Sequence, residues 1–87
     1  MPYSHPMPEP YNSQGWRVKI QDKERLEDPH VTIIFKRSRW RYNLRSMGFM
    51  DKRPDGAEVP EGIVAEIAKE RDRFVEEWNR INPQNPV

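Results

Sequence analysis

The chain has 87 residues, of which 34% are hydrophobic and 33% are charged, and its mean hydropathy is -1.07. These values allow one small domain with a thin core and exclude a second domain, so dimerisation or a partner could supply part of the stability. The chain contains no cysteine, which excludes disulfides and cysteine zinc sites and favours a reducing compartment such as the cytoplasm. We expect no membrane association and no signal peptide, because no apolar run approaches the ~20 residues of a membrane span.

The first segment, residues 1–14, contains four prolines and no lysine or arginine. Proline removes backbone donors and favours extended conformations, so we expect a disordered arm. The alternative is an extended ligand for a groove elsewhere, including a groove on a second subunit. His5 lies in this arm, and because the sequence offers no convergent ligands around it, no metal site is predicted.

The next segment, residues 15–20, alternates between apolar and basic residues and predicts a first strand. Trp16, Val18 and Ile20 would point inward, and Arg17 and Lys19 outward. The highly charged connection that follows, residues 22–29, ends in a proline, which predicts a loop with an extended entry into the next strand.

Residues 30–45 predict a hairpin with a two-residue turn at Arg37-Ser38. In this register, one apolar face pairs Val31, Ile33 and Phe35 with Leu44, Tyr42 and Trp40. The other face pairs His30, Thr32, Ile34 and Lys36 with Arg45, Asn43, Arg41 and Arg39. A turn at residues 46–48, with Gly48 free to take a positive φ, leads to a very short fourth strand at residues 49–50 or to a segment that only covers the core.

The last third changes to helical spacing, and its apolar residues occupy one arc of a helix from about residue 60 to residue 81. Pro60 suits the first helical position, and Asn82-Pro83 ends the helix. We therefore predict an α+β domain over residues 15–82, in which three or four antiparallel strands carry one long C-terminal helix on one face. Residues 83–87 would form a flexible tail.

Arg71 interrupts the apolar arc of this helix and has two interpretations. Its stem could cover an aromatic ring while the guanidinium reaches water or pairs with Asp51 or Asp28. Alternatively, the arginine marks a place where a carboxylate or phosphate of a partner docks.

The net charge of +1 conceals an uneven distribution. Residues 15–53 hold eleven lysines and arginines against five acids, and residues 54–87 hold four against eight. A basic sheet face is typical of proteins that bind a phosphate backbone, although the pI of 8.1 is below the ~9 usual for nucleic-acid domains. An acidic protein partner, or a solvated face that protects strand edges, would fit the same pattern. The residues predicted to line this face are Arg17, Lys19, Lys36, Arg39, Arg41 and Arg45.

His30 is the candidate catalytic residue, because it is the only histidine in the region predicted to fold. Beside Arg41 and Arg45 as phosphate clamps, it would suit metal-independent cleavage of RNA. A histidine that opens a strand is also typical of a structural hydrogen-bonding residue. The sequence has no glycine-rich phosphate loop and no other catalytic motif, so no cofactor is predicted.

Four short motifs resemble a family of small bacterial proteins of unknown function, often suspected to belong to toxin–antitoxin pairs. These motifs are residues 15–17, 28–32, 40–44 and 75–78. Members typically show a Pro-Pro-His-Val-His strand and a C-terminal helix that closes on a leucine-rich stretch with glutamate and tryptophan. The likeness spans about residues 15–81. Pro29 and His30 match, but Asp28 and Thr32 replace the first proline and second histidine, which argues against a paired-histidine site and leaves His30 as the only residue carried over.

These observations lead to three hypotheses. The first is a bacterial interaction module, part of a toxin–antitoxin-like pair, that presents its basic face to an acidic protein or to nucleic acid. The second is an RNA-cleaving toxin that uses His30. The third is a dimeric structural subunit, because Ile34 lies alone among polar neighbours on the outer face and the first strand is an exposed edge.

Overall fold

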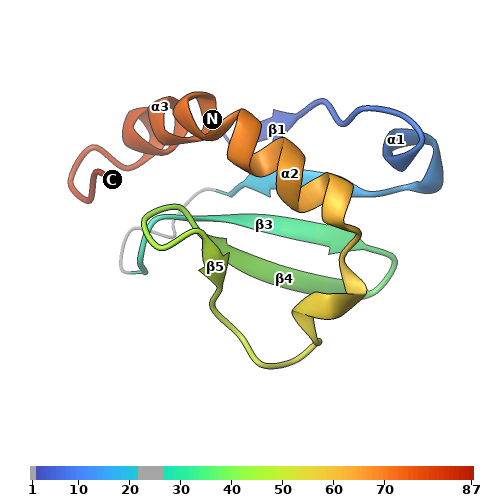
Figure 1. Ribbon diagram of the computed structural model, residues 1–87. Coiled ribbons are helices and arrows are strands. Elements are labelled where there is room, and N and C mark those ends of the chain that lie inside the picture. Colours follow the sequence, from blue (N-terminus) through green and yellow to red (C-terminus); the bar gives the residue numbers. More distant parts are fainter. Residues whose placement is uncertain (1, 22–26) are drawn as a thin grey trace.

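The computed structural model describes residues 2–21 and 27–87 (Figure 1). Five antiparallel strands form one sheet in the order β1-β2-β3-β4-β5. The strands are β1 (Tyr3–His5), β2 (Arg17–Ile20), β3 (His30–Phe35), β4 (Ser38–Asn43) and β5 (Gly48–Phe49). The helices are α1 (Tyr11–Gln14), η1 (Gly56–Glu58), α2 (Glu61–Lys69) and α3 (Arg71–Ile81). The predicted α+β class is confirmed, with more strands than expected.

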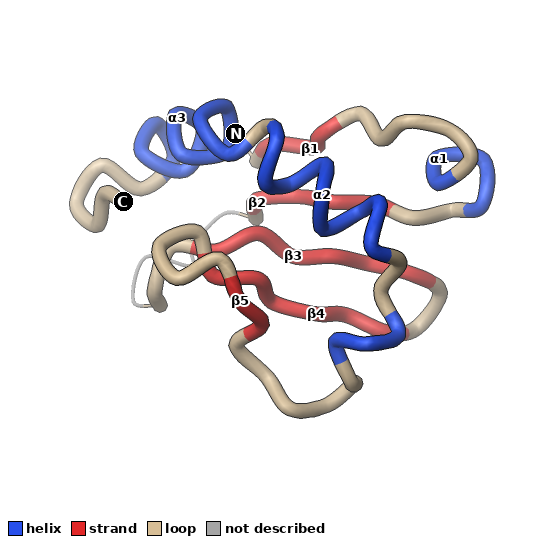
Figure 2. The backbone as a smooth tube through the Cα atoms, viewed as in Figure 1, coloured by secondary structure: helices blue, strands red, loops and turns tan. Residues whose placement is uncertain are grey.

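Helix α2 crosses one face of the sheet, and α3 continues beyond it on the same side (Figures 1 and 2). The core lies between these helices and the sheet. Its fully buried members are Val18, Ile20, Val31, Ile33, Leu44, Ile63, Ile67, Phe74 and Trp78. Trp40 and Tyr42, at 3% and 5% exposed, complete the inward row of β4, which confirms the predicted apolar face. Within the two described ranges, no helix has the length and apolarity that a membrane crossing requires.

The turn of the β3–β4 hairpin lies one residue earlier than predicted, which moves the cross-strand partner of each residue by two positions. Phe35 pairs with Ser38, so Lys36 and Arg37 form the turn in place of Arg37-Ser38. Lys36 takes a positive φ of 55° there. Because side chains alternate with a period of two, a shift of two residues changes every partner but leaves each side chain on its predicted face.

The turn before β5 also differs from the prediction. Met47, not Gly48, takes the positive φ, at 55°. The side chain of Asn43 compensates by accepting hydrogen bonds from the backbone N–H groups of Arg45 and Ser46, at 2.7 and 2.9 Å. Tyr42 also donates a hydrogen bond to the carbonyl oxygen of Met47 at 2.7 Å. The predicted short fourth strand exists as β5, one residue earlier than expected.

The N-terminal arm was predicted to be disordered over residues 1–14, but its described part, residues 2–14, is ordered. Strand β1 pairs with β2 in a register that places Tyr3 opposite Ile20 and His5 opposite Val18. The rings of Tyr3 and His5 then pack against Phe74 of α3, with centroids 6.0 and 4.7 Å away. Prolines flank this strand without interrupting it, as an edge strand allows. Strand β2 is therefore not the exposed edge that the sequence suggested.

The single helix predicted from residue 60 to 81 is two helices with a break at Glu70, where φ is -103° and ψ is 21°. Residues 69–73 are all charged and none is buried, so no core contact holds this stretch in line with α2. The buried positions lie on either side of the break, and α3 takes a different direction from α2 in Figure 1. The helical region ends at Ile81, before Asn82-Pro83 as predicted.

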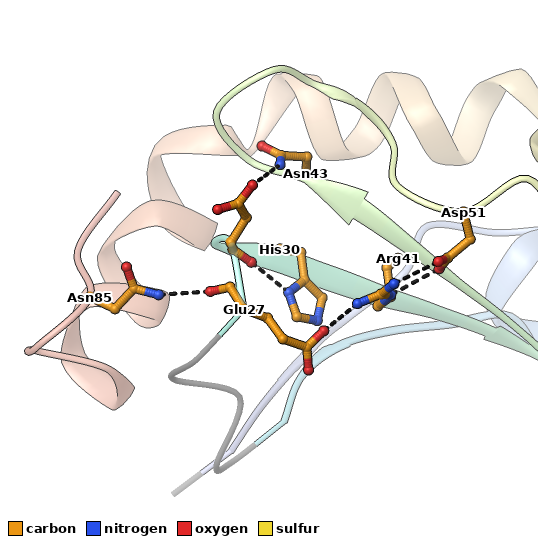
Figure 3. Close-up of polar contacts among 7 residues, drawn as sticks. Glu27, His30, Arg41, Asn43, Asp51 and Asn85 are labelled. Atoms are coloured by element: carbon orange, nitrogen blue, oxygen red, sulfur yellow. Dashed lines mark hydrogen bonds and ion pairs between the residues drawn. The ribbon is translucent and has the colours of Figure 1, made fainter.

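The last residues, predicted as a flexible tail over 83–87, make several hydrogen bonds to the rest of the chain. Trp78 Nε1 donates to the carbonyl oxygen of Asn85 at 2.7 Å. The side-chain amide of Asn85 donates to the carbonyl oxygen of Glu27 at 2.7 Å (Figure 3). These contacts connect the C-terminal segment to the entry of β3. Most of the predicted charged loop before β3, residues 22–26, lies outside the described residues.

Candidate functional site

The candidate site is the outer face of the sheet, opposite α2 and α3. The strand registers place Ile34 between Arg17 and Arg39 in one row. They place Thr32 between Lys19 and Arg41 in the next row. Because neighbouring strands lie about 4.8 Å apart, the backbones of the outer residues in each row are about 10 Å apart. Arg17 and Arg39 are exposed, and Lys19 is half-buried.

Two further cations lie in the hairpin turn, at the end of β3 and β4. Lys36 and Arg37 are both exposed, and the ammonium of Lys36 lies 5.1 Å from the ring centroid of Phe35. Arg37 was missing from the predicted set, although its place in the Lys-Arg-Ser-Arg run was a usable signal. We call the following five residues the cationic strip: Arg17, Lys19, Lys36, Arg37 and Arg39. Within the described part of the chain, none of the five forms an ion pair.

Arg41 lies on the same face but is neutralised by two carboxylates (Figure 3). Its Nε and Nη2 donate to the two carboxylate oxygens of Asp51 at 2.9 and 2.6 Å, and its Nη1 donates to Glu27. The hydrogen bonds that Arg41 donates to Asp51 and then to Glu27 raise the pKa of Arg41. The hydrogen bonds from Arg41 lower the pKa of Asp51. This end of the face therefore offers an incoming anion little net positive charge.

Arg45 is also engaged by the protein. It is exposed, and its Nη2 donates to the carbonyl oxygen of Pro86 at 2.8 Å. Its Nη1 lies 3.8 Å from a carboxylate oxygen of Asp28. The predicted basic face is thus divided between an unpaired end near the hairpin turn and a paired end near the entry of β3.

His30 is buried at the paired end, with 1% of its surface exposed. Its Nδ1 lies 2.8 Å from the carbonyl oxygen of Asp28, and since a carbonyl only accepts, Nδ1 carries the proton in this contact. The ring lies 5.4 Å from that of Trp78, between centroids. Asn43, not Arg45, is its cross-strand partner. An imidazole buried in this way has a structural role at the start of β3 and little access to a substrate.

Arg71 does not join the cationic strip, because it belongs to α3 on the covered side of the sheet. Its Nε donates to the carbonyl oxygen of Leu44 at 2.9 Å, whereas the sequence suggested an ion pair with Asp51 or Asp28. The side chain is half-buried. Arg71 therefore links α3 to the end of β4.

The arrangement can bind anions, because guanidinium groups donate paired hydrogen bonds to phosphate or carboxylate oxygens. At the outward positions of the described strands there is no tryptophan, tyrosine or phenylalanine, so the face offers no platform on which bases could stack. The resemblance to a small bacterial family stays a prediction. Comparisons of the chain with protein-family models, with curated proteins and with solved structures found no match.

Proposed function

We propose that this chain is a binding module whose cationic strip contacts the phosphate backbone of a nucleic acid. The observation that supports the proposal is a difference between arginines on the same sheet face. Arg41 is neutralised by Asp51 and Glu27, whereas Arg17 and Arg39 are exposed, and in the described residues they have no carboxylate partner. Exposed cations without carboxylate partners are what non-specific phosphate binding requires.

The kind of binding follows from the other side chains on the face. Without outward aromatic rings, stacking on bases contributes little, and contacts to phosphates dominate. Affinity should therefore depend on salt and depend little on base sequence. For a single strand, each neutralised phosphate contributes a slope of about -0.7 to the logarithm of affinity against the logarithm of salt concentration. With five cations, the steepest slope expected is about -3.5.

Fluorescence anisotropy with a labelled single-stranded RNA and a DNA duplex tests the proposal. The variant Arg17→Glu/Arg39→Glu should lose binding at every salt concentration. The matched control is Arg41→Gln/Asp51→Asn, which removes an ion pair from the same face without changing its net charge, and it should bind nearly as tightly as the wild type. Circular dichroism spectra that match that of the wild type would show that both variants fold. Affinity that does not change with salt, or an equal loss in the charge-neutral control Arg41→Gln/Asp51→Asn, would contradict the proposal.

An acidic protein is the second candidate, and it would include the cognate partner of a toxin–antitoxin-like pair. The observation that favours it is Ile34, a half-buried apolar side chain between Arg17 and Arg39. An apolar contact framed by arginines suits a protein surface better than a phosphate backbone. Isothermal titration with polyglutamate and with RNA of equal charge separates the two. Tighter binding of RNA supports the nucleic-acid proposal, and tighter binding of polyglutamate supports the acidic protein.

The RNA-cleaving hypothesis receives no support from the environment of His30. A general acid or base must come within hydrogen-bond reach of the substrate, and this imidazole is 1% exposed with Nδ1 bonded to Asp28. We therefore propose binding without catalysis.

A further inference from the structure

A second cluster of polar side chains lies on the opposite face of the sheet from the cationic strip, where His5 of β1 meets Glu66 of α2. It consists of His5, Glu66 and Glu70, whose nearest ligand atoms all lie within 4.8 Å of one another. The side chain of His5 is 6% exposed and that of Glu66 is 15% exposed. His5 Nε2 lies 3.0 Å from Glu66 Oε2. The cluster therefore places one buried nitrogen donor beside two half-buried carboxylates.

The fold brings these residues together from separate elements. The pairing of β1 with β2 turns His5 toward the covered side of the sheet. Glu66 and Glu70 are four residues apart, which places their side chains on the same face of a helix. Glu70 lies at the break between α2 and α3. Two carboxylates close together repel each other, and a cation bound between them would offset that repulsion.

The ring of His5 is held in position by its neighbours. The hydroxyl of Tyr3 lies 2.9 Å from Nδ1, and the ring of Phe74 packs against the imidazole with a centroid distance of 4.7 Å. Nε2 is thereby directed at the carboxylates. In metal sites, the second nitrogen of a ligating histidine is typically hydrogen-bonded in this way, which fixes the ring and its tautomer.

We propose that His5, Glu66 and Glu70 bind a divalent transition-metal ion. Imidazole nitrogen with carboxylate oxygen suits Zn²⁺, whereas Mg²⁺ prefers oxygen ligands alone. Zinc would displace the proton between Nε2 and Glu66. The metal-bound imidazole would be neutral with its single hydrogen on Nδ1, which would donate to the hydroxyl of Tyr3. Three protein ligands leave a fourth position for water or an anion. The ion would link β1 to α2 and so stabilise the position of the N-terminal strand. This role does not depend on the cationic strip.

Isothermal titration of the tag-free full chain with Zn²⁺ and with Mg²⁺ tests the proposal. One Zn²⁺ should bind per chain, in preference to Mg²⁺. Glu70→Gln is the decisive variant, because it removes a ligand but leaves the His5–Glu66 hydrogen bond intact. We expect Tyr3→Phe, which changes a positioning residue, to weaken binding about 10- to 100-fold, and Glu70→Gln to weaken it at least as much. Glu76→Gln, an exposed glutamate on α3, is the matched control and should bind like the wild type.

Nitrogen-15 NMR of the imidazoles gives an independent readout, because the chain has only two histidines. On addition of Zn²⁺, the Nε2 resonance of His5 should shift and that of His30 should not. Binding that survives in Glu70→Gln, a shift at His30 alone, or no Zn²⁺ binding at 100-fold excess over protein would each overturn the proposal.

Discussion

The two faces of the sheet are formed by the same strands, but the rest of the chain contacts them differently. On the covered face, Ile33 is fully buried among other apolar side chains. On the outer face, the next residue, Ile34, is half-buried between two arginines. The alternation of side chains decides which residues enter the core. Contacts from distant segments, such as those of Glu27 and Asp51 with Arg41, decide which charges on the outer face remain available.

The sharpest way to test this difference is the same substitution at adjacent positions. Ile33→Ala should lower the free energy of unfolding by about 2 to 5 kcal/mol, because it leaves a cavity in a packed core. Ile34→Ala should cost less than about 1 kcal/mol, because less apolar area is removed from contact. Urea denaturation of both variants measures the two values.

The Ile34 variant also addresses the dimer hypothesis. If a second copy covered Ile34, its replacement would cost as much as that of Ile33, and the unfolding midpoint would depend on protein concentration. Sedimentation at several concentrations gives the same information directly. Equal costs at the two positions would contradict the assignment of an open face.

Arg71→Met tests a contact that connects the covered face to the last helix. The variant leaves the carbonyl oxygen of Leu44 without the 2.9 Å hydrogen bond from Nε. An unsatisfied polar group in a partly buried place costs about 1 to 3 kcal/mol, so the variant should be less stable by about that amount. Lys69→Met, an exposed neighbour, should change stability by no more than about 0.5 kcal/mol. A more stable Arg71→Met variant would show that this hydrogen bond does not hold α3.

The sequence was sufficient to predict which side chains face the core, but not that His30 and Thr32, predicted on the outer face, would be buried. The alternation in residues 15–20 and 30–45 placed Val18, Ile33 and Trp40 inside and Arg17 and Arg39 outside, as the structure confirms. It could not fix the hairpin register. Neither candidate turn contains glycine or asparagine, the residues that usually mark a positive φ, and Lys36 takes that conformation instead.

Features that depend on contacts between distant segments were not predictable in this way. The ion pairs of Arg41 join residues 10 and 14 positions apart. His5 and Glu66 are 61 positions apart, and the proline-rich segment around His5 has no strand-like pattern of its own. The helix break at Glu70 lies in a stretch of charged residues without proline or glycine, so only the packing on either side reveals it.

The paired end of the outer face should respond to acid. Arg41 lowers the pKa of Asp51 in the folded chain below the value of about 3.9 expected when unfolded. The pair therefore stabilises the fold above that pH, and its contribution is lost as the pH falls through the lowered pKa. Because both side chains are about one-third exposed, Asp51→Asn should cost less than about 1 kcal/mol at neutral pH.

Urea denaturation between pH 2 and pH 7 measures this dependence. The difference in stability between the wild type and Asp51→Asn should shrink below about pH 4. In a double-mutant cycle, the effect should be nearly absent in the Arg41→Gln background. A difference that stays constant down to pH 2 would assign the cost to something other than this ion pair.

The last prediction concerns the difference between the paired and unpaired ends of the outer face, and its expected effect is the smallest. It removes the carboxylates that pair with Arg41. The double variant Glu27→Gln/Asp51→Asn removes both carboxylates that neutralise it and so lengthens the unpaired positive surface by one cation. If the face binds phosphates as proposed, affinity for single-stranded RNA should rise severalfold, and the salt slope should steepen by about 0.7. Adding Arg41→Gln to this variant should abolish the gain. An increase that persists without Arg41 would mean that the loss of negative charge alone, rather than a freed guanidinium, attracts the nucleic acid.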